Sequence, residues 1–187
     1  MSSQITHLSI AKRFLQKHAG VVKDVQRFLD GNVVPDLAAN KAESHYGVRT
    51  EMHDIVKRNT EKVNPMKFAM THDMRDDFNK GQYLHLYVDY QYYNCFLLSY
   101  FQQRLPVERM ATDMYETTRR DDAYLQKKYG VTYGDTSFER ELQRINAIWD
   151  TENAKKRCQP GYEFTIPYDL VALDKFVEKM SDTSIPE

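Results

Sequence analysis

The segment "GQYLHLYVDYQYYN", residues 81–94, sets His85 and Asp89 four residues apart among tyrosines, leucines and a valine. It continues into "CFLLSYFQQ", residues 95–103, without a proline. The run is too long for one ordinary strand, so we predict a helix. On that helix the side chains of residues 78, 81, 85, 89, 92 and 96 share one face. Two titratable groups therefore lie one turn apart within an aromatic stripe.

The composition is that of a folded domain. The chain has 187 residues, of which 41% are hydrophobic and 28% charged, and this suits a single domain over residues 1–187. Its net charge of -1 gives no electrostatic footprint for nucleic acid, so we expect no nucleic-acid partner. No apolar run approaches the roughly 20 residues of a transmembrane helix. No secretory signal opens the sequence, so we expect a cytoplasmic protein.

Helices are predicted throughout. Glycine and proline are scarce and β-branched alternation is rare, which favours an all-α domain of about six or seven helices. We expect the first helix to begin at a Thr6 cap, and the second to stop near Gly31 before an irregular connection over residues 32–47. A later helix is predicted from Thr136 and Glu139, which have the spacing of a capping box.

A metal would explain the pair on the central helix. An unpaired buried carboxylate costs several kcal/mol, and one helical turn presents both side chains to a single ion. All six histidines lie in the first 85 residues, so further ligands are sought there. The candidates are His7 on the apolar face of the first helix, Asp36 in the irregular connection, and His45 in "SHYG". Three imidazoles and two carboxylates suit zinc and similar divalent transition metals. Each residue alone also fits a structural role, as a core histidine, a turn residue or a loop residue.

Three segments of the chain resemble a known family. In order and rough spacing, "THLSIA", "FLDGNVVPDLAANKAESHYG" and "GQYLHLYVDYQYY" are similar to the motifs of the zinc-dependent phospholipase C family, whose fold is shared with the fungal single-strand nucleases. Together these segments span about the first 95 residues. The resemblance implies an all-helical bundle with a metal cluster at one end, and hydrolysis of a small phosphoester substrate.

The resemblance also implies roles for individual residues. One metal would be held by Asp36, His45, His85 and Asp89, and a second by His7 and a bridging Asp89. The family's N-terminal Trp is absent, and no histidine follows His85 to form a third site. The expected cofactor is therefore one or two zinc ions. Metal-bound hydroxide would attack phosphorus, with Asp36 as ligand and general base. Tyr46 and Tyr92 are candidate residues of the pocket wall.

Other interpretations stay open at this stage. The dipeptides His53–Asp54 and His72–Asp73 are the pattern of HD-type phosphohydrolases, which bind a metal through adjacent His and Asp. A helical binding module with a structural metal is a non-enzymatic alternative. In each case we expect residues 106–187, which contain no histidine, to provide scaffold and no metal ligand.

Overall fold

The computed structural model describes residues 3–47, 63–97, 100, 107–158 and 168–186, and within these residues the regular elements are helical. An isolated antiparallel bridge joins Tyr46 to Val63. The prediction of an all-α protein is confirmed. The elements are α1 (Gln4–Lys17), α2 (Val25–Leu37), α3 (Lys41–Ser44), α5 (Pro65–Thr71), α6 (Asp77–Gln91), η1 (Tyr92–Leu97), α8 (Val107–Tyr129), η2 (Tyr133–Asp135), α9 (Glu139–Arg157) and α10 (Leu170–Ser181).

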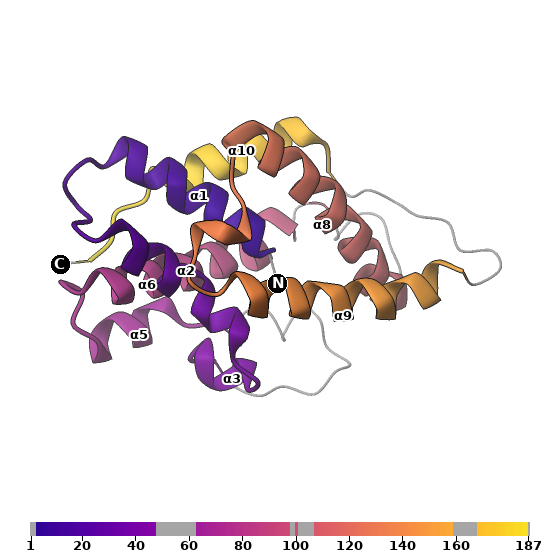
Figure 1. The fold of residues 1–187 in the computed structure, drawn as a ribbon, viewed down its shortest axis with the longest axis horizontal. Coiled ribbons are helices and arrows are strands. Elements are labelled where there is room, and N and C mark those ends of the chain that lie inside the picture. Colours follow the sequence, from indigo (N-terminus) through magenta and orange to yellow (C-terminus); the bar gives the residue numbers. More distant parts are fainter. Residues whose placement is uncertain (1–2, 48–62, 98–99, 101–106, 159–167, 187) are drawn as a thin grey trace.

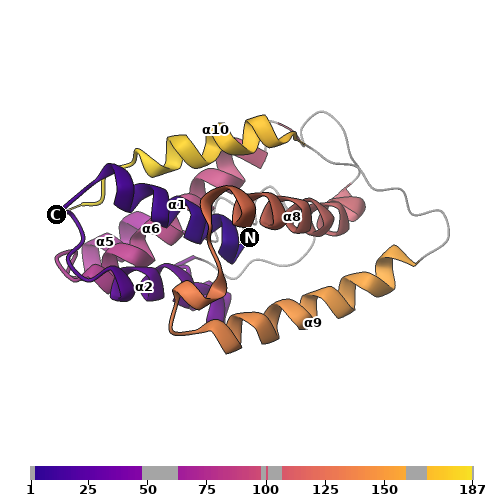
Figure 2. The same ribbon diagram turned by 45° about the horizontal axis from the view of Figure 1, so that its top comes forward.

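Helix α1 lies at the centre of the bundle. It contacts α2, α6, α8 and α10, and Figures 1 and 2 show it between α10 on one side and α2 with α6 on the other. Ile5, Leu8 and Phe14 bury its apolar face almost completely. The Ser3 hydroxyl accepts a hydrogen bond from the Thr6 N–H at 3.0 Å. The predicted Thr6 cap is therefore wrong, because Ser3 caps the helix and Thr6 lies in its first turn.

Two glycines let α2 and α6 cross at very short range. A Cβ on Gly31 would lie 2.0 Å from the Phe78 carbonyl oxygen, and one on Gly81 would lie 2.0 Å from the Phe28 carbonyl oxygen. The predicted stop near Gly31 is wrong, since α2 continues past it and through Pro35 to its end. The glycine is required by this interhelical contact and does not end the helix. Pro35 is tolerated because it lies in the last turn, where it removes one helical hydrogen bond.

Helix α6 runs directly into the π-helical turn η1, which begins at Tyr92. The predicted central helix is thus observed as far as Leu97, and residues 98–99 and 101–106 lie outside the described part of the chain. Such π-helical turns are frequent at functional sites. This one follows Asp89 after less than one turn.

The C-terminal half adds α8, α9 and α10 around this core. In Figure 2, α10 and α9 lie on opposite sides of the bundle. Helix α9 begins at Glu139. The Thr136 hydroxyl accepts a hydrogen bond from the Phe138 N–H at 3.2 Å, so its partner lies before the helix and not in the helix's first turn. The capping box predicted at Thr136 and Glu139 is therefore wrong. In the part of the chain that the structure describes, no helix is both long and apolar enough to cross a membrane.

Candidate metal centre

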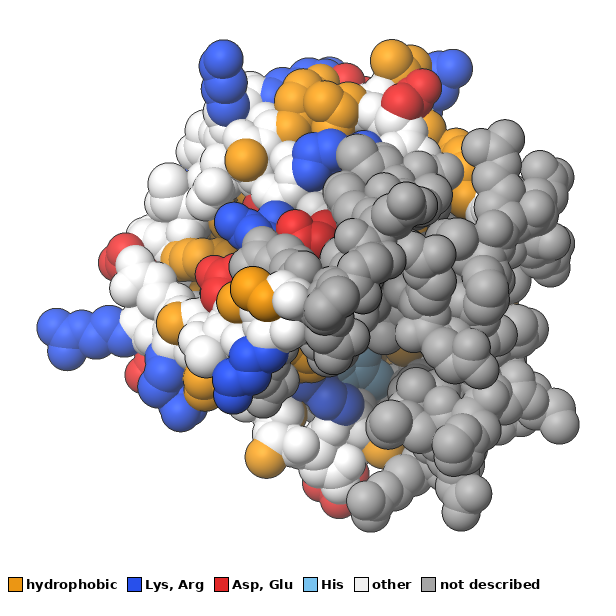
Figure 3. Space-filling view, turned by 90° about the vertical axis from the view of Figure 1, so that its right-hand side faces the viewer, with side chains coloured by type: hydrophobic (Ala, Val, Ile, Leu, Met, Phe, Trp, Pro, Cys, Tyr) orange, Lys and Arg blue, Asp and Glu red, His pale blue; other side chains and the backbone are white. Residues whose placement is uncertain are grey.

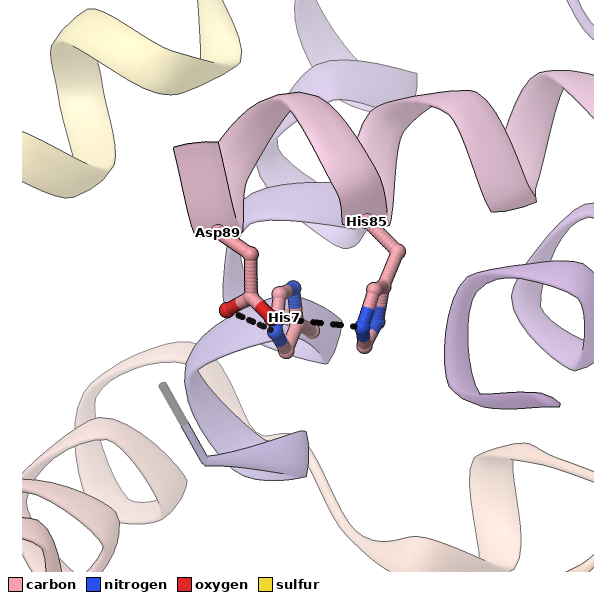
Figure 4. Close-up of side chains that lie close together, drawn as sticks. All are labelled: His7, His85 and Asp89. Atoms are coloured by element: carbon pink, nitrogen blue, oxygen red, sulfur yellow. Dashed lines mark ion pairs between the residues drawn. The ribbon is translucent and has the colours of Figure 1, made fainter. Parts of the chain in front are cut away.

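The structure brings together all five side chains that the sequence singled out. They come from α1, from α2, from the residue that ends α3, and from α6. Figure 4 shows three of them, with two imidazole rings beside one carboxylate. All five are buried, with exposed fractions of 0% for His7, His85 and Asp89, 2% for Asp36 and 3% for His45.

Asp89 is at the centre of the cluster. Its Oδ2 lies 3.3 Å from Nε2 of His45 and 3.7 Å from Nε2 of His85. Its other oxygen, Oδ1, lies 3.3 Å from Nε2 of His7. The two oxygens of one carboxylate therefore face two different groups of ligands. Oδ1 of Asp36 lies 4.0 Å from Nε2 of His45.

Backbone carbonyls contact Nδ1 of two histidines. Nδ1 of His85 lies 2.8 Å from the Asn32 carbonyl oxygen, and Nδ1 of His45 lies 3.0 Å from the Lys41 carbonyl oxygen and 2.9 Å from the Ser44 hydroxyl. The Asn32 carbonyl only accepts hydrogen bonds, so Nδ1 of His85 carries the proton and donates it. In the neutral His85 ring, Nε2 then bears a lone pair that points into the cluster. Metal-binding histidines are oriented in this way by their surroundings.

The Nε2 atoms of His45 and His85 face each other at 3.3 Å. At this distance the lone pair of His85 Nε2 is satisfied either by a proton on His45 or by a cation bound between the two rings. Ligand atoms about 2.0–2.1 Å from a tetrahedral zinc ion are about 3.3 Å from one another. The distances from His45 Nε2 to His85 and to Asp89, both 3.3 Å, match this spacing, and the distance from His85 to Asp89 is longer, at 3.7 Å.

His7 defines a second, overlapping group. Ligand atoms of His7, His85 and Asp89 lie within 4.8 Å of one another, and so do those of Asp36, His45 and His85. The rings of His7 and His85 stack with their centroids 3.7 Å apart. The two groups share His85, whose Nδ1 is occupied by a backbone carbonyl, so its Nε2 serves one ion at a time.

Polar neighbours hold both oxygens of Asp36. Gln4 donates to Oδ2 at 3.0 Å, and Asn146 on α9 in turn donates to the Gln4 side chain at 3.3 Å. Lys41 donates to Oδ1 at 3.0 Å and also to the Asp36 backbone carbonyl. Burial acts to raise the pKa of Asp36, but its electrostatic interactions with His85 and with the Lys41 ammonium group outweigh burial and hold the pKa below its usual value.

The electrostatics keep the site ready to bind a cation. Burial, together with the neighbouring His7, lowers the pKa of His85 to about 3, so this ring is neutral at physiological pH. Burial opposes ionisation of Asp89, but hydrogen bonds from His45 and His7 lower its pKa well below the usual value. The neutral His85 ring and the ionised carboxylates are therefore in the protonation states in which these groups bind metals.

Sequence reasoning missed three residues of the site, Gln4, Asn32 and Lys41. Asn32 acts through its backbone, which no side-chain pattern reveals. Lys41 lies in a segment that was expected to be irregular, and no motif in the sequence marked it as a residue of the site. Gln4 could have been found from the sequence, because it lies three residues before His7 and so shares its helix face.

The candidate pocket residues Tyr46 and Tyr92 have other contacts. Tyr46 has a φ of 59° and its hydroxyl lies 3.1 Å from Nε2 of His72. The Tyr92 hydroxyl donates to that of Tyr168 at 2.9 Å, and Tyr168 donates to Asp121 at 2.5 Å. Neither tyrosine has a hydrogen bond to the five clustered side chains among those found in the described residues.

The His-Asp dipeptides do not form a site in the described residues. His72 is bonded to Tyr46, while Asp73 is 54% exposed and pairs with Arg75. The other dipeptide, His53–Asp54, lies outside the described residues. No group of candidate metal ligands among the described residues draws on the C-terminal half, where the sequence predicted none.

Comparisons with known proteins add no assignment. No protein-family model, no curated protein and no solved structure matches this chain. The resemblance to the phospholipase C family stays a prediction that rests on the three sequence segments.

Proposed function

We propose that this protein is a metal-dependent hydrolase of small phosphate esters, with zinc as the metal. The observation that carries the proposal is the approach of Nε2 of His45 to Nε2 of His85, at 3.3 Å and beside Asp89, in a buried group of ligand-type side chains. A divalent ion between them would bind both nitrogens and neutralise the buried carboxylates. Imidazole and carboxylate ligands suit zinc and similar divalent transition metals, and zinc is the metal proposed here.

The residues present also fit the chemistry of phosphoester hydrolysis. A bound divalent ion acidifies water and takes charge from phosphoryl oxygens. Asp36 is the proposed general base, because Gln4 holds its Oδ2 while Oδ1, which accepts a hydrogen bond from Lys41, lies 4.0 Å from Nε2 of His45. The order and spacing of the motifs shared with the phospholipase C family support the same reaction class. On the face in Figure 3, acidic and basic side chains of the described residues are interspersed, which gives no support to a nucleic-acid substrate.

One observation favours a structural metal in a binding module instead. The five residues are at most 3% exposed, as in closed structural sites. Against this, the five residues offer more donors than the four that a closed zinc site uses, and Lys41, which contacts Asp36, is 37% exposed.

Activity of matched variants separates the two functions. Protein made without a metal-affinity tag is loaded with zinc and assayed on phosphate monoesters and diesters. We expect hydrolysis that chelator abolishes, a loss of about 100-fold or more in His85→Ala, and normal activity in His18→Ala. His18 is the control because its Nε2 contacts the Ser181 carbonyl at 3.0 Å, away from the cluster. Zinc-loaded protein that hydrolyses none of the esters would leave the structural metal as the function.

A further inference from the structure

Lys41 joins two of the candidate ligands. It is the first residue of α3, directly after the Asn40 cap. Its backbone carbonyl oxygen lies 3.0 Å from Nδ1 of His45, and its ammonium group donates to Asp36 Oδ1 at 3.0 Å. The ammonium group therefore lies beside the carboxylate oxygen that faces the histidines.

Its exposure distinguishes Lys41 from the ligands. The Lys41 side chain is 37% exposed, whereas that of Asp36 is fully buried. A buried partner of Asp36 would serve only to balance its charge. Because the lysine side chain is partly exposed, long and flexible, its ammonium group can also turn toward a molecule that arrives from solvent. Lys41 thus lies at the border between the buried cluster and solvent.

The distances place Lys41 within reach of a bound anion. Ligands of one zinc ion are about 3.3 Å apart, so an anion oxygen that binds next to Asp36 Oδ1 lies about this far from it. Lys41 Nζ is already 3.0 Å from the same Oδ1 atom. A small rotation of the side chain brings it to the anion without breaking the backbone contact to His45. Lysine commonly binds phosphate as a point charge.

We propose that Lys41 is a substrate-binding residue that contacts a phosphoryl oxygen of the ester. This proposal rests on the proposed function, since it assumes a metal in the cluster. The proposal predicts a different role for each group of residues in the site. His45, His85 and Asp89 hold the ion, Gln4 fixes Asp36, and the Lys41 charge selects anionic ligands.

Binding of inorganic phosphate to zinc-loaded protein tests the proposal by calorimetry. Lys41→Gln keeps an N–H donor for Asp36 and removes the charge. Lys67→Gln is the matched control, because Lys67 is exposed on α5. We expect both variants to take up zinc as the wild type does. Phosphate affinity should fall roughly tenfold or more in Lys41→Gln, the usual contribution of a charge-assisted hydrogen bond, and stay unchanged in Lys67→Gln. Lys41→Arg should recover most of it.

The outcomes separate this proposal from the proposed function. Zinc-loaded Lys41→Gln that binds phosphate as tightly as the wild type shows that Lys41 only balances Asp36, and overturns the proposal alone. Equal losses in Lys41→Gln and Lys67→Gln show a general charge effect and also overturn it. A wild-type protein that takes up no zinc overturns the metal site and this proposal together.

Discussion

Replacing Gly81 with alanine tests whether the close crossing of α2 and α6 builds the site. The new Cβ would lie 2.0 Å from the Phe28 carbonyl oxygen and 2.8 Å from the Asn32 nitrogen. Both are backbone atoms, so no side-chain rotation relieves the overlap. The two helices must move apart by about 1 Å, because protein interiors have no free space to absorb the carbon atom.

The expected loss of stability follows from two opposing contributions. Overpacking costs about 1–3 kcal/mol, and a clash between backbones belongs at the upper end or beyond. Alanine returns about 1 kcal/mol through its higher helix propensity. We expect a net loss of about 2 kcal/mol in the free energy of unfolding. His85 lies one turn after Gly81 and would also move from the Asn32 carbonyl, now at 2.8 Å. Disturbing such an orienting contact lowers metal affinity by about 10–100-fold.

Urea unfolding of metal-free protein and a zinc titration measure the two effects. Gly134→Ala is the control, because the nearest atoms to its Cβ are side-chain atoms at 3.5 Å. Its free energy of unfolding should stay within about 0.5 kcal/mol of the wild type. The reasoning is refuted if Gly81→Ala unfolds at the same urea concentration as Gly134→Ala and binds zinc as the wild type does.

Three further predictions concern charge and stoichiometry. His85 has a pKa of about 3 in the folded protein, against 6.5 in the unfolded chain. Metal-free protein should therefore lose about 2 kcal/mol of stability between pH 7 and pH 5. Urea unfolding at both pH values measures this loss, and an equal loss in His85→Gln contradicts the prediction. His7→Ala should retain about one zinc per chain and lose a second, weaker ion; elemental analysis showing unchanged zinc content makes His7 a core histidine. Asp122 accepts a hydrogen bond from Ser3, and burial raises its pKa to about 8. This group destabilises the folded protein increasingly as pH rises from 4 to 8. Asp122→Asn should therefore be more stable than the wild type at pH 8 and equally stable at pH 4. Urea unfolding that shows equal stability of the variant and the wild type at pH 8 contradicts this.

The sequence predicted the helical fold and one part of the site from periodicity. His85 and Asp89 were found because an uninterrupted helix places them one turn apart, and His7 because it lies on an apolar helix face. Asp36 and His45 were candidate ligands from their residue types alone, and only the family resemblance grouped them with His85 and Asp89 around one metal. Their positions depend on α2 continuing past Gly31, which in turn depends on a contact with α6.

That contact could not be read from local sequence. Gly31 near the end of an amphipathic segment predicts a helix stop. Only the close contact with the Phe78 backbone of α6 shows that the glycine is needed for helix packing. The caps at Thr6 and Thr136 failed for a related reason. Several nearby Ser and Thr residues can cap the same helix, and tertiary contacts decide which one does.

Elemental analysis of protein purified without a metal-affinity tag tests the central claim most directly. We expect at least one tightly bound zinc ion per wild-type chain, and its loss in His85→Ala, because Nε2 of His85 lies 3.3 Å from Nε2 of His45 in a buried cluster that also holds two carboxylates. Folded wild-type protein that is isolated without metal, and takes up none when dialysed against zinc, would contradict the account.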